Sequence, residues 1–316
     1  MKAQKISLVL FALALLGTPL FLKDPYFLEI LIFIGIYSLI TMGLNLLMGY
    51  AGQISLGHAA FYAIGAYTVG LLTTRFQLPF FAAAGAALLL TAVVAYLIGV
   101  PSLKLKGHYL AMATLAFGEI VYICLNATVD ITGGPSGIAG IPQLQIGGFV
   151  FNTETRYFYL VWSITLLFFI FTRNMIDSRT GRALRSIHGS ETAASAMGIN
   201  VSAMKIRVFV ISALYASLAG ILYAHYITFI SPHMSDLTFS IRLVTMVVVG
   251  GMGYLWGGIL GTALLLLLPQ FLSVFEDYDM LCYGLILLVM VMFLPGGLAG
   301  GGRSLLLKLS GKEKPS

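Results

Sequence analysis

Few residues in this sequence have side chains that could do chemistry, and Glu119 is the most costly of them. It lies near the middle of a predicted helix over 108–127, in the apolar run AMATLAFGEIVYICLN. An acid at the centre of a bilayer costs about 2.5–3.5 kcal/mol on insertion scales, so its side chain should face protein or water. Glu119 is therefore a candidate for lining or gating a transport pathway. The alternative is a structural hydrogen bond to a neighbouring helix.

Three further polar side chains, Gln53, Ser55 and His58, are spaced among glycines in the segment GYAGQISLGHAAF. Glycines let backbones approach closely, so this segment could form part of a gate or a broken helix. Equally, the three side chains could only bridge two closely packed helices. A metal-binding role for His58 is disfavoured, because no second ligand lies near it in the sequence.

The insert over 174–206 carries a third group of polar residues in two short helical patterns, GRALRSIH and ETAASAMG. Gly189 is expected to end the first helix in a left-handed conformation, and Ser190 is expected to cap the second. Glu191 falls in the first turn of the second helix, where the helix dipole favours an acid. A compact helical hairpin of this kind suits docking onto another protein. A solvated loop whose arginines only fix the topology is the alternative.

The composition indicates which elements must position these residues. Hydrophobic residues make up 59% and charged residues 9% of the 316 residues, and the mean hydropathy is +0.95. Ordinary globular domains are about 25% charged, and disorder requires high charge with low hydrophobicity. The chain is therefore predicted to be an all-α polytopic membrane protein. The net charge of +6 does not indicate nucleic-acid binding, because the basic residues lie in short breaks between apolar runs.

About ten transmembrane helices are predicted, with eight as the lower bound and some of them short or discontinuous. A crossing needs roughly 20 mostly apolar residues. The run 243–274 is too long for one crossing and is interrupted by VVGGMGYLWGG, so it is predicted to form two short crossings, 243–253 and 257–274. The other predicted spans are 6–22, 27–48, 59–74, 80–100, 108–127, 157–173, 207–229 and 280–296.

The basic residues assign the orientation of these spans. Lys and Arg are enriched in cytoplasmic loops, and fourteen of the 18 fall on one side of the predicted membrane. Both termini are on that side and are therefore predicted to be cytoplasmic. The first run is expected to stay uncleaved, because no clear small-residue cleavage site follows it. The fourteen are Lys2, Lys5, Lys104, Lys106, Arg173, Arg179, Arg182, Arg185, Lys205, Arg207, Arg303, Lys308, Lys312 and Lys314, whereas Lys23, Arg75, Arg156 and Arg242 are expected outside.

The outer connection over 128–156 contains DITGGPSGIAGIPQLQIGG, whose glycines and prolines predict turns. It could meet a protein that delivers substrate, or it could be a plain connector. The same two interpretations apply to a polar cluster near the predicted outer mouth. Its members are His225, Ser231, His233 and Asp236.

Five segments, taken in this order, resemble the LivM-type permease family of branched-chain amino acid importers: GLNLLMGYAGQISLGHAAFYAIGAY, TGGPSGIAGIP, GRALRSIHGSETAASAMGIN, ISALYASLAGILYAHY and VVVGGMGYLWGGILG. Ala193, Ala194 and Gly198 match the spacing of the coupling-loop pattern of ABC importers, which is E-A-A, three residues, then Gly. Glu191 departs from this pattern by lying one position early, with Thr192 where the pattern has Glu. The residues expected to couple to an ATPase are Arg182, Arg185, Glu191, Ala193, Ala194 and Gly198.

The resemblance implies a single transmembrane permease domain over 1–316 that forms half of a translocation pathway in a bacterial inner membrane. It also implies a second, LivH-type permease, two cytoplasmic ABC ATPase subunits and a substrate-binding protein outside the membrane. No G-x-x-x-x-G-K-[ST] pattern occurs in the sequence. Hydrolysis of ATP is therefore expected on the partner subunits, with no enzymatic activity and no cofactor in this chain.

Other classes of function are weighed against this one. Related permeases carry small solutes such as urea or short-chain amides, and the sequence does not fix the substrate. A secondary transporter would need charge pairs at the midplane beyond Glu119. A membrane enzyme would need clustered His, Asp or Glu, such as H-E-x-x-H, and the sequence has no such motif.

Overall fold

The computed structural model describes residues 11, 15–19, 24–272, 284–285, 288, 292 and 296–301. The predicted spans 6–22 and 280–296 lie mostly outside the described residues, as do the basic residues of both chain ends. The longer helices are α2 (Pro25–Asn45), α3 (His58–Thr74), α4 (Phe80–Ser102), α5 (His108–Ala127), α7 (Glu154–Asp177), α10 (Val201–Ile227), α11 (Leu237–Gly250) and α12 (Gly257–Leu272).

The described part of the chain is mostly helical and has several membrane-spanning helices. Five helices there are long and apolar enough to cross a membrane, namely Pro25–Tyr50, α4, α5, α7 and α10. The first of these is α2 continued by a π-helical turn, η1 (Leu46–Tyr50). α11 and α12 are shorter apolar helices. This is the multi-pass helical architecture that the composition predicts.

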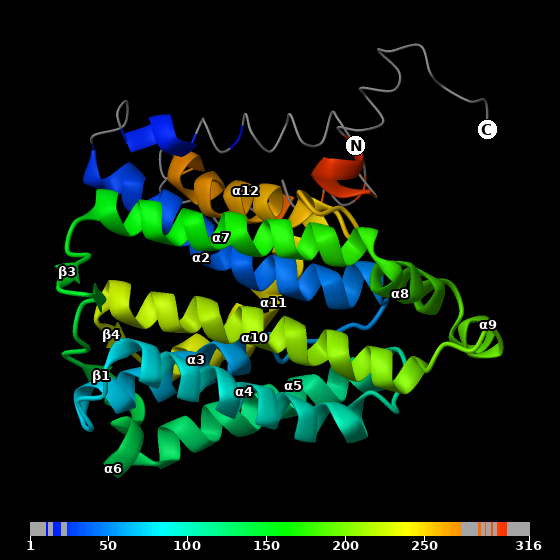
Figure 1. Ribbon diagram of the computed structural model, residues 1–316, viewed down its shortest axis with the longest axis horizontal. Helices are drawn as coiled ribbons and strands as arrows, with labels where there is room; N and C mark the ends of the chain where they lie inside the picture. Colours follow the sequence, from blue (N-terminus) through cyan, green and yellow to red (C-terminus); the bar gives the residue numbers. More distant parts are fainter. Residues whose placement is uncertain are drawn as a thin grey trace.

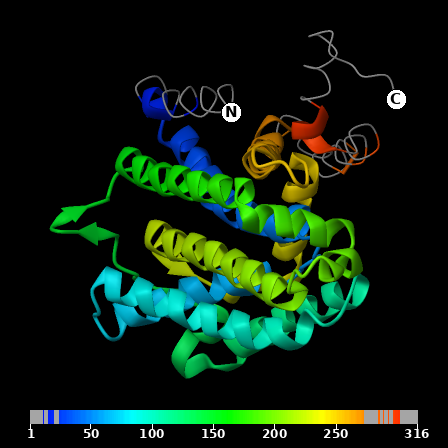
Figure 2. The same cartoon turned by 45° about the vertical axis from the view of Figure 1, so that its right-hand side comes forward.

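The short elements gather at the two ends of the bundle (Figure 1). We call one of them the loop end, where α8 (Arg179–Gly189) and α9 (Glu191–Ala196) project. The opposite, strand end carries β1 (Ile138–Ala139) paired antiparallel with β4 (Phe229–Ile230), and β2 (Gln145–Ile146) paired antiparallel with β3 (Phe149–Val150). Figure 2 shows the β2–β3 hairpin projecting from this end. The described part of the chain also contains three short helices: α6 (Val129–Thr132), η2 (Gly134–Ser136) and η3 (Pro232–Ser235).

Burial separates a central helix from the helices at the periphery. The apolar window of Pro25–Tyr50 is 83% buried, whereas the windows of α4 and α5 are each 22% buried. Large apolar side chains such as Phe81, Leu97 and Ile120 are exposed on α4 and α5. Because these surfaces are apolar and the helices are long enough to span, they form a lipid-facing surface. α2 forms the core.

α3 and α10 pack closely because small residues lie where they cross. A Cβ atom on Gly220 of α10 would come within 2.0 Å of the Tyr62 carbonyl oxygen on α3. A Cβ atom on Gly65 would similarly come within 2.3 Å of the Ser217 carbonyl oxygen. Neither position accepts a larger side chain without separating the helices. Gly220, at the end of the segment SALYASLAG, therefore allows the close packing of α10 on α3.

The apolar run 243–274 is divided into two helices, as predicted, because a turn separates α11 from α12. Asn45 holds this turn with both ends of its amide: Nδ2 donates to the Tyr254 carbonyl at 2.7 Å, and Oδ1 accepts from the Gly253 N–H at 2.9 Å. The start of α11 differs from the prediction. Asp236 caps the helix by accepting from the Phe239 N–H at 2.7 Å, so α11 begins at Leu237 and already contains Arg242.

Candidate coupling loop and transport pathway

The insert over 174–206 contains the two predicted helices, α8 and α9. Ser178 starts α8 by accepting a hydrogen bond from the Thr180 N–H at 3.1 Å. Leu184 and Ile187 are buried, so α8 is fixed to the bundle by one apolar face. The prediction that Gly189 ends α8 in a left-handed conformation is wrong. The helix runs through Gly189, and the chain leaves it through the extended residue Ser190, with φ −162°.

α9 is capped and ended as the sequence predicts. The Ser190 Oγ accepts from the Ala193 N–H at 3.2 Å, and Gly198 ends the hairpin at φ +81°, a conformation that favours glycine. The two alanines expected to couple to an ATPase differ in exposure: Ala194 is buried, whereas Ala193 is exposed. Met197 is 78% exposed at the tip of the hairpin. Sequence reasoning missed this residue, although a large apolar side chain at the tip of a polar hairpin is itself a docking signal.

Glu191 lies at the base of the hairpin, where it joins three segments of the chain. Its carboxylate forms an ion pair with Lys205 in the second turn of α10. Lys106, in the connection between α4 and α5, is 3.9 Å away. Gln53 Nε2 donates to Glu191 Oε1 at 3.4 Å and to the Ala51 carbonyl at 3.0 Å. Two groups that the sequence presents separately, the hairpin and the GQISLGH segment, are therefore in direct contact.

A second polar chain continues from the GQISLGH segment into the bundle. Ser55 Oγ lies 3.0 Å from His58 Nδ1, and His58 Nε2 lies 2.6 Å from Ser212 Oγ on α10. All three side chains are almost completely buried. With both ring nitrogens hydrogen-bonded to hydroxyls, His58 links α3 to α10. This geometry fits the interpretation that these side chains bridge two packed helices.

Arg182 and Arg185 lie on the exposed side of α8 and fold back toward the end of α7. Arg185 donates to the Ile176 carbonyl at 3.1 Å, and Arg182 donates to the Asp177 carbonyl at 3.4 Å. The last carbonyls of a helix lack intrahelical partners and carry partial negative charge, so cations there are stabilising. Both arginines therefore position α8 against α7.

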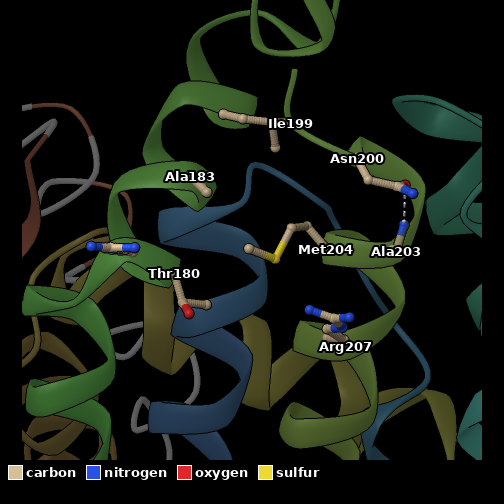
Figure 3. A pocket seen from close by; sticks show the side chains of 8 residues that line it. Thr180, Ala183, Ile199, Asn200, Ala203, Met204 and Arg207 are labelled. Carbon is tan, nitrogen blue, oxygen red and sulfur yellow. Dashed lines mark hydrogen bonds between the residues drawn. The ribbon is translucent and has the colours of Figure 1, made fainter. Parts of the chain in front are cut away.

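A pocket of about 380 Å³ opens between α8 and the first turns of α10. Figure 3 shows its side chains converging from the two helices and from the connection between them. Its floor is apolar, and arginines from both helices line it. The lining residues are Arg179, Thr180, Ala183, Ile199, Asn200, Ala203, Met204 and Arg207.

Glu119 is half-buried on α5, between the buried Gly118 and the exposed Ile120. Among the residues that the structure describes, its carboxylate has no hydrogen bond or ion pair with another side chain. The alternative of a structural hydrogen bond within this chain is thus not realised in the described part. The carboxylate thus lies at the edge of the apolar face of α5, where an acid requires a contact with protein or water.

Two of the four polar residues of the strand-end cluster, His225 and Asp236, have structural hydrogen bonds. His225 Nδ1 lies 2.8 Å from the Pro142 carbonyl of the 128–156 connection, and Asp236 caps α11. That connection follows tight turns at glycines of positive φ, such as Gly133 and Gly140, as its composition predicts.

The fold is that of a multi-pass membrane permease: spanning helices surround a buried central helix, and a helical hairpin is attached to the end of the bundle. A family model described as "Branched-chain amino acid transport system / permease component" matches residues 26–293. The chain therefore belongs to this family of transport-system permease components.

Relatives of known function agree with this assignment. The high-affinity branched-chain amino acid transport system permease protein LivM of Salmonella typhimurium is 34% identical over 302 residues, covering 88% of this chain and 71% of the relative. LivM of Escherichia coli is 34% identical over 286 residues, covering 83% and 67%. A ribose import permease protein, RbsC of Haemophilus influenzae, is 23% identical over 297 residues, covering 90% of each chain. No solved structure is significantly similar to the chain.

Proposed function

We propose that the chain forms half of the translocation pathway of an ATP-driven importer for branched-chain amino acids. The whole chain acts as one transmembrane permease domain with about ten crossings and with both termini and the loop end in the cytoplasm of a bacterial inner membrane. The relatives that are most similar over most of the chain carry branched-chain amino acids by name, whereas the sugar permease is less similar. The LivM relatives therefore favour a branched-chain amino acid over a sugar as the substrate.

The observation that carries the proposal is the contact between the hairpin and the GQISLGH segment. An ATP-driven importer must convert movement of a soluble ATPase into movement of transmembrane helices. Glu191 links the base of α9 to the buried Lys205 of α10 and to Gln53. When the hairpin moves, α10 and the residues that precede α3 therefore move with it.

The surface that meets the ATPase follows from exposure. Ala193 and Met197 point away from the bundle, whereas Ala194 is buried and Glu191 is engaged with Lys205. We assign docking to the exposed face of α9 and to the arginine-lined pocket beside α8, where acidic side chains of an ATPase groove would be neutralised. Arg182 and Arg185 contribute by holding α8 in place. The Gly198 turn sets the direction of the chain after α9.

The remaining subunits complete the transporter. A second permease of the LivH type supplies the other half of the pathway, and a binding protein delivers substrate at the strand end. The 128–156 connection and the β2–β3 hairpin offer it a surface. The chain itself needs no cofactor, because ATP is hydrolysed on the two ATPase subunits.

The test is reconstitution of the complete transporter in lipid vesicles, with uptake of leucine, isoleucine, valine and urea measured with and without ATP. ATP-dependent uptake of the amino acids alone is the expected result. Uptake that follows an ion gradient without ATP contradicts the proposal, and uptake of urea alone contradicts the substrate.

Docking is tested separately by co-purification of the ATPase subunits. Met197→Asp places a charge on the docking face and should release the ATPase. Gln143→Asp places the same charge on an exposed residue at the strand end and should leave the complex intact. Equal retention of the ATPase by both variants would place the dock elsewhere.

A further inference from the structure

Arg242 is an exposed cation in the interior of a short apolar helix. It shares one face of α11 with Thr238 and Ile241, which are also exposed, and with Thr245 one turn further on. A charged side chain inside a membrane faces protein or a water-filled path rather than lipid, because its desolvation in hydrocarbon is costly. This face of α11 must therefore be covered by something polar in the working transporter.

The surface beside Arg242 is aromatic. Five half-buried rings from α2, α10 and α11 form what we call the aromatic wall: Phe33, Tyr37, Tyr223, Tyr226 and Phe239. The ring centroids of Tyr37 and Phe239 are 5.5 Å apart, and those of Phe33 and Tyr226 are 5.8 Å apart. Arg242 follows Phe239 by three residues on α11, so the two side chains lie on the same side of the helix. The cation and the wall are thus parts of one surface.

This surface lies halfway along the spanning helices. Tyr37 is the middle of the span Pro25–Tyr50, so it is roughly 18 Å of helix from either end at about 1.5 Å per residue. A phospholipid headgroup sits near the ends of a spanning helix and would not reach this depth. An anion that meets this surface is therefore a carboxylate of another protein chain or a solute in a water-filled path.

We propose that Arg242 and the aromatic wall form one half of a transient substrate site in the translocation pathway. The Arg242 guanidinium binds the carboxylate of the amino acid, and the wall contacts its apolar side chain. Guanidinium groups recognise carboxylates through paired, charge-assisted hydrogen bonds, and half-buried aromatic rings offer apolar area to a branched aliphatic group. The inference rests on the proposed function and assigns its substrate to named residues.

Uptake kinetics of the reconstituted transporter provide the first test. Arg242→Gln removes the charge, Arg242→Lys keeps it, and Arg75→Gln is a matched control at an exposed arginine that follows the end of α3. Loss of a charge-assisted bond should lower the maximal rate of leucine uptake about 10- to 100-fold in Arg242→Gln. Arg242→Lys should retain most of the rate, and Arg75→Gln all of it. Unchanged uptake by Arg242→Gln would overturn the proposal.

Thiol labelling distinguishes a pathway residue from a structural one. Cys124 and Cys282 are first replaced by Ser, and Arg242→Cys is then treated with membrane-impermeant reagents. Labelling should be slowed by leucine together with the binding protein. A reagent that adds an ammonium group should restore uptake, and one that adds a sulfonate should not. No labelling, or labelling at a rate that leucine does not alter, would contradict the site.

The two proposals fail in different ways. If the wild-type transporter takes up no amino acid with ATP, the proposed function fails whatever the variants do. If the wild type transports and Arg242→Gln transports equally well, only the site fails. Loss of assembly in the Gln, Lys and Cys variants alike would make Arg242 an interface residue and overturn its role in substrate binding.

Discussion

Among the contacts at the loop end, removal of the ion pair between Glu191 and Lys205 should lower the stability of the protein most. Glu191→Gln keeps the size of the side chain and removes its charge. The Lys205 side chain is only 3% exposed, so its ammonium would be left in a buried site without a counter-charge. Lys106, the other lysine near this carboxylate, has a side chain that is 73% exposed and serves as the internal control.

The expected loss of folding free energy follows from this difference in burial between Lys205 and Lys106. Breaking a buried ion pair on one side costs about 3–5 kcal/mol. Because the Glu191 side chain is 25% exposed, solvent screens part of the interaction, and we expect about 2–3 kcal/mol. Lys106→Met should cost less than about 1 kcal/mol, as is usual for exposed pairs. The double variant Glu191→Gln, Lys205→Met should recover most of the loss, since no unpaired charge remains.

Unfolding of the purified permease in mixed micelles at rising denaturing-detergent concentration measures these differences. The same variants are then assayed for ATP hydrolysed per leucine transported, because the pair also joins the hairpin to α10. We expect Glu191→Gln to lower stability and to raise this ratio, and the double variant to restore stability. Equal effects of Glu191→Gln and Lys106→Met, or additive effects in the double variant, would refute the assignment of a buried coupled pair.

Three other substitutions test the bundle. His58→Ala leaves the buried hydroxyls of Ser55 and Ser212 without their partner and should cost about 2–4 kcal/mol, measured by the same unfolding assay against the exposed Ser186→Ala. Asn45→Ala removes both hydrogen bonds that hold the α11–α12 turn and should cost a similar amount, about 2–4 kcal/mol, with faster proteolysis at 251–256 as a second readout. Glu119→Gln should reduce uptake while the complex still assembles. The control Glu154→Gln, in the exposed first turn of α7, should leave uptake unchanged. Normal uptake by the Glu119→Gln variant would show that Glu119 is not part of the pathway.

Much of the fold follows from the period and length of apolar segments. The hairpin is predictable because Ser190 and Gly198 are strong local signals for the start and end of a helix. The division of 243–274 is predictable because the five glycines of VVGGMGYLWGG interrupt it. The predicted start of α11 is too late because the charge of Arg242 places the start of the apolar run at 243, whereas the cap at Asp236 begins a helix that includes Arg242.

The contacts of the candidate site depend on packing that no local pattern encodes. Gln53 and Glu191 are separated by more than a hundred positions in the sequence, and only the tertiary arrangement brings them within 3.4 Å. The spacing of Ala193 and Ala194 suggests two equivalent docking residues, yet the rotation of α9 buries one and exposes the other. The burial of Lys205 cannot be predicted from the sequence either, because lysines near the ends of membrane spans normally reach solvent.

The polar contacts of this chain explain how movement at the loop end could reach the middle of the membrane. The hairpin is bound through Glu191 to α10, and His58 binds α10 again at Ser212, two turns deeper. α10 also contributes Tyr223 and Tyr226 to the aromatic wall that Arg242 borders. α10 therefore contacts the hairpin at one end and carries part of the proposed substrate surface toward the other. If α10 moves as a rigid helix, no other element is needed to transmit movement between the two. A tilt of α10 would move both together, so the state of the ATPase and the width of the pathway would be linked through one element.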